Sequence, residues 1–435
     1  MSGLDEHITK TEAERGLTVS GSGVMGAVEK NSARTIATLL IGAGLLLSAV
    51  ALFQTLLPLR AGIEEFSPAL VGYLGTVYAT GFIVGCVFGP ALVKTVGHIR
   101  TFSGVVAIAA AVSLLYPLWP NVFLWLALRF FSGVALAIAY MVIESWLNDQ
   151  SDNTTRGRVL SIYIIVANVT TMAGQLLVNV ASTAGQTLFA LVTFLLCLAV
   201  VPIALTPTSE PTPIPTARLE LKGLLSISPV GTVGCLLVGA VEGAFWTLGP
   251  TFGQLRDMSV FEITLLMAAF VLGGTLSQWP LGKLSDHYDR RLVILPVALG
   301  TVATGFLIAF WPLSDLWAIL ALATIHGALM VPLYALCLAH ANDNVATNKL
   351  VQTSSGLLLI YSIGAAIGPT IAAQLIEYSD ESGLFVFISA ILAVFALFIV
   401  YRLAFGPVYD RLQRSPFTPL PKTSQSVFEL EVDDD

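Results

Sequence analysis

Twelve apolar stretches, each long enough to cross a lipid bilayer as a helix, constrain this chain more than any other feature. A bilayer core is spanned by about 20 apolar residues in a helix, and every backbone polar group inside it must be paired within the segment. The sequence therefore predicts an all-α integral membrane protein with twelve transmembrane helices. The expected spans lie at 35–58, 69–93, 101–118, 121–146, 158–181, 186–205, 229–252, 262–282, 292–311, 316–339, 350–376 and 384–405.

The scarcity of charged residues points to the same environment. They make up only 11% of the sequence, whereas a soluble domain carries about 25%. The lipid bilayer is therefore the expected solvent, and the net charge of −7 gives no reason to expect nucleic-acid binding. The cysteines have neither zinc-site nor disulfide-framework spacing, so we expect no metal and no other cofactor. All lie inside apolar stretches, at Cys86, Cys197, Cys235 and Cys337.

Polar segments divide the chain into five parts. Residues 1–34 are polar and lack the basic start and short apolar core of a signal peptide, which predicts a disordered cytoplasmic arm. The central segment 206–228 begins with the Pro-rich sequence TPTSEPTPIPT and is expected to be a semi-rigid cytoplasmic linker. It separates two six-helix halves at 35–205 and 229–405, and residues 406–435 form a cytoplasmic tail.

Lysine and arginine residues gather on one side of the predicted spans. Of the 21, 18 fall in the N-terminal arm, the C-terminal segment and the loops on the same side. Only Arg60 and Arg256 fall on the other side, and Arg129 lies within a span. Because cytoplasmic loops are rich in these residues, we expect a multi-pass protein of the cell (inner) membrane with both termini in the cytoplasm.

The two predicted halves repeat the same residues at nearly constant spacing. Four residues recur at an offset of 194, and Phe53, Pro58, Ser67 and Gly81 recur at an offset of 192. The first four are Gly133, Tyr140, Asn148 and Asp149, with Gly327, Tyr334, Asn342 and Asp343 as their mates. A third repeated segment pairs AGQLL at 173–177 with AAQLI at 372–376, at an offset of 199. This pattern predicts two pseudo-symmetric six-helix bundles that enter the membrane in the same direction.

The segment GKLSDHYDRR at 282–291 resembles the signature of the major facilitator superfamily, a Gly with an Asp four residues on and then paired basic residues. The matching residues are Gly282, Asp286, Arg290 and Arg291. His287 stands where Arg or Lys is usual, and Asp289 stands where Gly is usual. The resemblance implies the two-bundle fold of this superfamily and secondary transport of a small molecule.

A second motif, LALRFFSGVALA at 126–137, resembles the fourth-span motif of the superfamily, with Arg129 and Gly133 in the matching positions. The segments YMVIESWLND and PLYALCLAHANDN are most similar to the YcaD-type branch. The fifth-span antiporter signature is missing from VANVTTMAGQLL. This absence argues against transferring drug–proton antiport to this chain.

Three ionisable residues, Arg129, Glu242 and His326, lie deep in the predicted spans. A charge at the bilayer centre costs about 2.5–3.5 kcal/mol on insertion scales, so we expect them to face a cavity or a partner. The resemblance implies that the first, fourth, seventh and tenth spans line the central path, and the three residues lie on three of these. Each also has a structural interpretation. Arg129 can bind backbone carbonyls, Glu242 can pack as a neutral acid, and His326 can bond a neighbouring helix.

Four further candidates for the substrate or proton path share helical faces or symmetry positions with these residues. They are Tyr140, Trp246, Tyr334 and Gln54, the last of which is the symmetry mate of Trp246. Aromatic residues in apolar helices usually pack against neighbours, so substrate contact stands beside packing as an alternative for each.

The cytoplasmic ends of the spans carry a second set of candidates, for gating. Asp286 lies where the eighth predicted span leaves the membrane, near Arg290 and Arg291. We expect a charged latch between neighbouring helices there. The latch is expected to form in the outward-facing state and break in the inward-facing one, because only contacts that differ between states bias their populations. The other gating candidates end the fourth and tenth spans and are Glu144, Asp149, Asn342 and Asp343.

The leading hypothesis is secondary active transport of a small-molecule substrate by alternating access. Protons are the expected coupling ion, with Glu242 as the coupling carboxylate, and Arg129 attracts an anionic group or modulates a proton site. Efflux of amphipathic compounds and uptake or exchange of an anionic metabolite both stay open. A transporter-derived receptor or scaffold is the alternative. No phosphate-binding loop or catalytic set is visible, so we expect no enzyme, and we expect a monomer.

Overall fold

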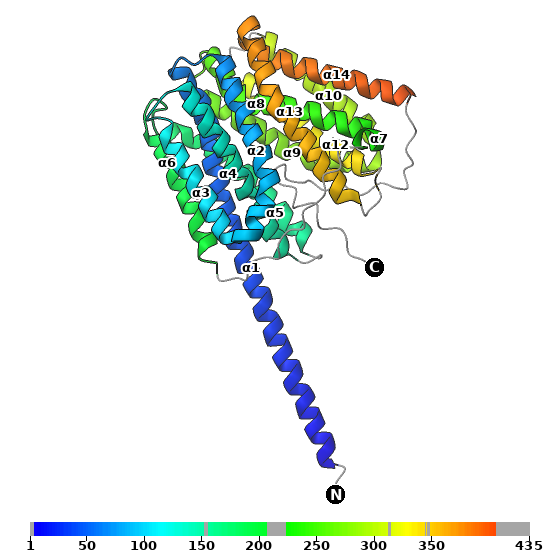
Figure 1. Ribbon diagram of the computed structural model, residues 1–435. Helices are drawn as coiled ribbons and strands as arrows, with labels where there is room; N and C mark the ends of the chain where they lie inside the picture. The colour runs from blue at the N-terminus through cyan, green and yellow to red at the C-terminus, as the bar shows by residue number, and fades with distance from the viewer. Residues whose placement is uncertain are drawn as a thin grey trace.

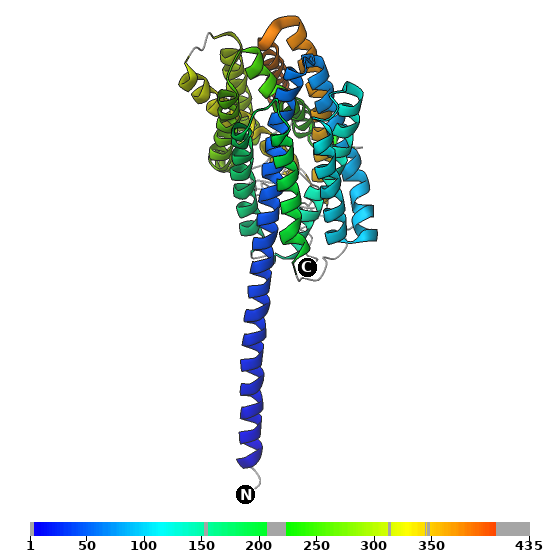
Figure 2. The same cartoon turned by 90° about the vertical axis from the view of Figure 1, so that its left-hand side faces the viewer.

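Two helical bundles lie side by side in the structure, and the N-terminal helix α1 projects beyond them (Figures 1 and 2). The structure is a computed structural model that describes residues 4–151, 155–206, 223–311, 315–343, 345 and 349–405. Side chains are described from residue 34 onward, residue 351 excepted. Every regular element within these residues is helical, as the sequence predicts.

The first bundle contains α1 (Leu4–Ile63), α2 (Pro68–Val96), α3 (His98–Leu115), α4 (Val122–Asp149), α5 (Arg156–Leu176), the 3-10 turn η1 (Leu177–Val180) and α6 (Thr187–Ala204). The second half contains the short α7 (Leu224–Ile227), α8 (Pro229–Leu255), α9 (Val260–His287), α10 (Arg290–Phe310), α11 (Leu316–Met330), α12 (Leu333–Asn342), α13 (Leu350–Ser379), the 3-10 turn η3 (Asp380–Ser382) and α14 (Gly383–Phe405).

Eleven stretches of the described residues are long and apolar enough to cross a membrane. The last of them, Gln352–Phe405, has 54 residues, more than twice the length that one crossing needs. The turn η3 divides it into α13 and α14, which accounts for the difference from the twelve predicted spans.

The N-terminal arm differs from the expectation. Helix α1 begins at Leu4 and runs without interruption to Ile63, where the sequence analysis expects a disordered arm over 1–34. No proline interrupts the arm, and a helix already nucleated in the first span is extended at low cost. The part long and apolar enough to cross a membrane is Arg34–Ile63. Most of the predicted linker and the whole of the tail 406–435 lie outside the described residues.

Equivalent residues cap equivalent helices in the two halves. The Ser67 side chain accepts a hydrogen bond from the first turn of α2, and Ser259 does so for α9. Asn121 and Asp315 do the same for α4 and α11. These side chains satisfy backbone N–H groups that have no partner within the helix. They therefore help to fix where four of the spans begin.

The tenth predicted span, 316–339, is broken where its counterpart α4 is continuous. Helix α11 ends at Met330, and α12 begins after Pro332. Proline lacks a backbone N–H and its ring clashes with the preceding turn, whereas the equivalent position in α4 is Ile138. The two halves therefore present different backbone shapes at the same depth.

Close helix pairs are built on glycine at matching positions of the two halves. A Cβ at Gly133 of α4 would overlap the carbonyl oxygen of Tyr78 in α2, and a Cβ at Gly327 of α11 would overlap that of Phe270 in α9. Small residues allow such close approach inside lipid. The contacts are related by the offsets of 192 and 194 found in the sequence, which confirms the predicted repeat. The reverse contacts are Gly81 against Phe130 and Gly273 against Thr324.

The predicted equivalence of AGQLL and AAQLI, at an offset of 199, is wrong. Gly174 of α5 packs against the Ser48 carbonyl of α1, and Gly368 of α13 packs against the Ala240 carbonyl of α8. These contacts relate α5 to α13 by 194 residues, so AGQLL and AAQLI are not structural equivalents. Gly, Ala and Leu are frequent in packed membrane helices, and short matches among them arise without duplication.

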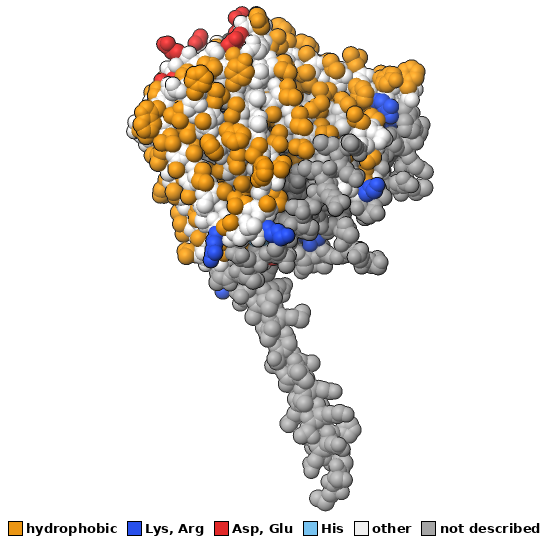
Figure 3. Space-filling model, viewed as in Figure 1, with side chains coloured by type: hydrophobic (Ala, Val, Ile, Leu, Met, Phe, Trp, Pro, Cys, Tyr) orange, Lys and Arg blue, Asp and Glu red, His pale blue; other side chains and the backbone are white. Residues whose placement is uncertain are grey.

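Hydrogen bonds join the two halves near the ends of the helices that the sequence analysis places outside. The Ala69 backbone N–H donates to the Glu377 carboxylate at 3.2 Å, and the Gln254 amide donates to the Leu59 carbonyl at 2.9 Å. On the face shown in Figure 3, the described surface is mostly apolar, Asp and Glu lie at its upper end, and Lys and Arg lie at its lower and right-hand edges. Charge is therefore concentrated at the ends of the bundles.

Candidate functional site

Arg129 lies on α4 and is only 3% exposed. Its Nη2 donates a hydrogen bond to Oε1 of Gln54 on α1 at 2.5 Å. The guanidinium carbon lies 4.4 Å from the ring centroid of Tyr78 and 5.6 Å from that of Phe53. Two predicted path residues, Arg129 and Gln54, are thus in direct contact. Sequence reasoning found Gln54 only as the symmetry mate of Trp246 and missed Tyr78.

Glu242 lies on α8 and is 2% exposed. The hydroxyl of Tyr361 on α13 donates a hydrogen bond to its Oε2 at 2.6 Å. The ring of Tyr334 on α12 lies 4.7 Å from that of Tyr361, between centroids. The structure therefore groups two predicted residues, Glu242 and Tyr334, around a third that was missed. A tyrosine inside the apolar run LLLIYSIG was the available signal for Tyr361.

Trp246 belongs to an aromatic cluster beside this site. Its ring lies 5.9 Å from Phe245 and 5.9 Å from Phe270, and Phe245 stacks on Phe270 at 3.9 Å, between centroids. Edge and offset contacts of this kind stabilise beyond the area that they bury. The packing interpretation of Trp246 is therefore well supported, and substrate contact stays a prediction.

His326 is fully buried in α11 and contacts other helices of its own bundle. Its Nδ1 lies 2.8 Å from the Thr304 hydroxyl of α10, and its ring lies 5.4 Å from that of Phe385 on α14, between centroids. No hydrogen bond or ion pair joins it to Glu242 within the described residues. The arrangement matches the interpretation of His326 as a bond between neighbouring helices.

Tyr140 lies on the same helix as Arg129 and packs toward α2. Its ring centroid is 6.3 Å from that of Phe82, and Phe82 is equally far from Tyr78. A row of aromatic rings therefore leads from Tyr140 to Arg129. Tyr140 is thus separated from Arg129 by two aromatic rings, whereas its symmetry mate Tyr334 packs against the tyrosine that binds Glu242.

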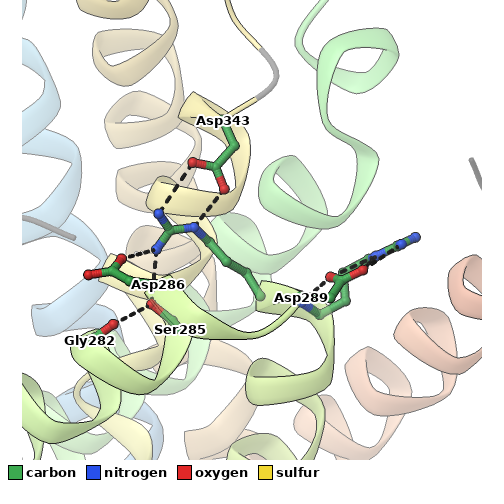
Figure 4. A network of polar contacts seen from close by, with 7 residues as sticks. Gly282, Ser285, Asp286, Asp289 and Asp343 are labelled. Atoms are coloured by element: carbon green, nitrogen blue, oxygen red, sulfur yellow. Dashed lines mark hydrogen bonds and ion pairs between the residues drawn. The ribbon is translucent and has the colours of Figure 1, made fainter. Parts of the chain in front are cut away.

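Arg290 organises the predicted gating residues of the second half (Figure 4). It is 1% exposed, and its Nε and Nη2 bind the two carboxylate oxygens of Asp343 at 2.6 and 3.2 Å. Its Nη1 lies 3.4 Å from Asp286 Oδ1 and 2.9 Å from the Ser285 hydroxyl, which itself donates to the carbonyl of Gly282 at 2.7 Å. This arrangement joins α9, α10 and the residue that ends α12.

Arg291 has different partners. It binds Asp289 at 2.8 Å and the Arg402 carbonyl of α14 at 3.3 Å. Burial would raise the pKa of Asp289, but hydrogen bonds from Arg291 and its positive charge hold that pKa below the usual value. The Asp289 side chain also caps α10. The acid at the position where the signature usually has Gly therefore serves as a helix cap and an ion-pair partner.

The described residues of the first half show no equivalent of this arrangement. The counterparts of Asp286, Asp289 and Arg290 are Lys94, Gly97 and His98, and Gly97 and Asp289 both precede their helices at the same point. The first half therefore carries Lys94 at the position that the signature Asp occupies in the second half.

The remaining gating candidates lie at the same helix ends. Glu144 accepts a hydrogen bond from the Tyr163 hydroxyl at 3.2 Å, which links α4 to α5. Asn342 accepts one from Ser354 of α13 at 3.1 Å, whereas Asp149 accepts one from its neighbour Gln150 at 3.3 Å.

Asp343→Asn should destabilise the protein more than Asp286→Asn. The first change removes the carboxylate that binds the buried Arg290 guanidinium in a bidentate contact, which costs about 3 kcal/mol of folding free energy. The second removes a half-exposed contact that is worth less than about 1 kcal/mol. Thermal unfolding in detergent measures both. Asp286→Asn should still insert normally while transporting more slowly. Equal melting temperatures for the two variants, or normal transport by Asp286→Asn, would contradict the assigned roles.

Comparisons with known proteins identify the family. The model of the Major Facilitator Superfamily matches residues 39–261 and, a second time, residues 231–430. The chain belongs to the Major Facilitator Superfamily. The double match agrees with the duplicated halves. Members of this superfamily are transporters and not enzymes, so this facilitator is a multi-pass membrane transport protein with a small-molecule substrate.

The relatives of this facilitator are similar over nearly their whole length. It is 31% identical over 377 residues to the uncharacterized MFS-type transporter YcaD of Escherichia fergusonii, covering 84% of this chain and 95% of the relative. It is 31% identical over 389 residues to YcaD of Shigella flexneri, covering 86% and 97%. The resemblance to the YcaD-type branch is thereby confirmed.

Solved structures share the fold at low sequence identity. The nucleoside transporter NupG matches with a TM-score of 0.72 and 12% identity, over 85% of this chain and 99% of that one. A bacterial homolog of the human lysosomal transporter Spinster, in an inward-facing and unoccupied conformation, matches with a TM-score of 0.65 and 15% identity, over 89% and 98%. These likenesses confirm the architecture of the facilitator and leave its substrate open.

Proposed function

We propose that this facilitator is a secondary active transporter that moves a small solute by alternating access and couples its transport to protons. Membership of the superfamily supports transport itself. The proposal assigns the proton to Glu242 and places both termini in the cytoplasm. The gathering of basic side chains at one end of the bundles supports that orientation.

The hydrogen bond between Glu242 and Tyr361 is the observation that carries proton coupling. An ionised carboxylate at this depth is strongly disfavoured, and a hydrogen bond from a phenol offsets only part of the cost of desolvating a charge. Protonation removes that penalty, so the charge of Glu242 is the quantity that a proton gradient can control. The bond also joins α8 to α13, and both helices contact the first half. Proton release can therefore act on the seam between the halves.

The seam supports an inward-facing assignment for the observed conformation. The Ala69–Glu377 and Gln254–Leu59 hydrogen bonds tie the halves together near their outer ends, and the similar Spinster homolog is described as inward-facing. The Arg290–Asp343 pair is formed in this conformation. The proposal therefore keeps the latch as a contact within the second half and drops its expected rupture in the inward-facing state.

A reconstituted substrate screen tests the proposed function. Purified protein in proteoliposomes is offered labelled solutes with and without an inward proton gradient. We expect at least one solute to accumulate only with the gradient, and an ionophore that collapses the gradient should abolish that accumulation. Counterflow without any response to pH would contradict proton coupling. Failure of the whole panel to exchange across the membrane would favour a receptor or scaffold.

A further inference from the structure

Arg129 is a buried cation without a carboxylate partner in the part of the chain that the structure describes. Its one protein acceptor is the neutral amide oxygen of Gln54, while Nε and Nη1 have no hydrogen-bond partner among these residues. Arginine carries five N–H donors. Most of its hydrogen-bonding capacity is therefore unused in a place that water reaches poorly.

The protein compensates this charge only in part. The faces of Tyr78 and Phe53 offer cation–π attraction, worth up to about 2 kcal/mol when desolvated. An uncompensated buried charge is more unfavourable than that. The fold does not require the arrangement either, because the symmetry mates of Arg129 and Gln54 are Ala323 and Trp246. Something other than packing accounts for a cation here.

Gln54 is well placed to be exchanged for a better acceptor. It is partly exposed, as is Tyr78, whereas Arg129 behind them is buried. A carboxylate or phosphate accepts two parallel N–H bonds from a guanidinium and adds a full opposite charge. Such a group, replacing the Gln54 amide, would bind donors of Arg129 that are now unused.

We propose that Arg129 binds the anionic group, carboxylate or phosphate, of the transported solute, and that Gln54 occupies this site when the solute is absent. The proposal rests on the proposed transport function and specifies the substrate class. The anion neutralises Arg129 in the first half, and a proton neutralises Glu242 in the second. Because both neutralisations lower the cost of enclosing charge, the expected cycle carries a monoanion together with a proton.

Anion binding is tested without any gradient, so its outcome is independent of coupling. The full chain in nanodiscs is titrated with benzoate and phenyl phosphate, and with benzamide and benzyl alcohol as neutral analogues, while its melting temperature is followed. We expect at least one anion, and neither neutral compound, to raise the melting temperature. The two anions separate carboxylate from phosphate recognition.

Gln54→Glu is the decisive variant, because it preserves size and acceptor geometry while supplying Arg129 with a permanent counterion. We expect it and Arg129→Gln to weaken anion binding about 100-fold. Gln186→Glu, an exposed residue that precedes α6, adds the same charge elsewhere and should leave binding unchanged. Equal stabilisation by the neutral compounds, no response to either anion, or a full response in Gln54→Glu would overturn the proposal.

Discussion

Glu242→Gln should abolish proton-driven accumulation while leaving solute exchange measurable. Glutamine keeps the acceptor oxygen for the Tyr361 hydroxyl and nearly the same volume, but it cannot bind or release a proton. Transport that depends on changing the charge of this side chain therefore loses its driving force. We expect accumulation under an imposed gradient to fall about 100-fold, as for a general acid–base group worth 10²–10⁴. Counterflow of the same solute without a gradient should fall much less.

Two further variants sharpen this experiment. Tyr361→Phe removes the hydrogen-bond donor but leaves the carboxylate, so it should shift the pH dependence of transport rather than abolish coupling. Glu262→Gln removes a carboxylate at the start of α9 while keeping a residue suited to the capping box, and it should transport normally. Gradient-driven accumulation by Glu242→Gln at the wild-type level would exclude Glu242 as the coupling group.

The architecture was accessible from the sequence because two independent signals agree. The length of the apolar stretches defines the spans. Capping residues such as Ser67 and Ser259 recur because the same hydrogen bonds start equivalent helices. The break at Pro332 was misjudged because hydropathy does not register backbone geometry. The extension of helix α1 into the arm was not predicted for a similar reason, because polarity alone does not distinguish a polar helix from a disordered segment.

The sequence pointed directly to the charged members of the candidate site, and to Gln54 and Tyr334 only through symmetry or a shared helical face. Arg129 and Glu242 stand out because charge is rare in a span, whereas their partners are side chains that occur throughout apolar helices. Tyr361 and Tyr78 approach them from helices far away in the sequence, and no spacing rule relates such residues. His326 shows the opposite limit, because depth in a span does not tell whether a side chain faces the central path or its own bundle.

Valine at Gly133 or at Gly327 should destabilise the transporter severely and to a similar extent. Even a Cβ at either position overlaps a backbone carbonyl of the facing helix, that of Tyr78 or that of Phe270. A backbone cannot move aside as a flexible side chain can, so α2 must separate from α4, or α9 from α11. Overpacking of this kind costs about 1–3 kcal/mol or more for each site.

The matched control is Gly104→Val on α3, because nothing lies within 4 Å of a Cβ built at that glycine. Valine there should insert and melt like the wild type, since helices in lipid tolerate an apolar branched residue on an open face. Melting temperatures in detergent and the monodisperse fraction after extraction measure all three variants. A stable Gly327→Val beside an unstable Gly133→Val would mean that the second bundle can relax where the first cannot, and the two halves would then be mechanically unequal despite their shared packing. Stability of both variants would show that the close glycine contacts do not hold the helix pairs together.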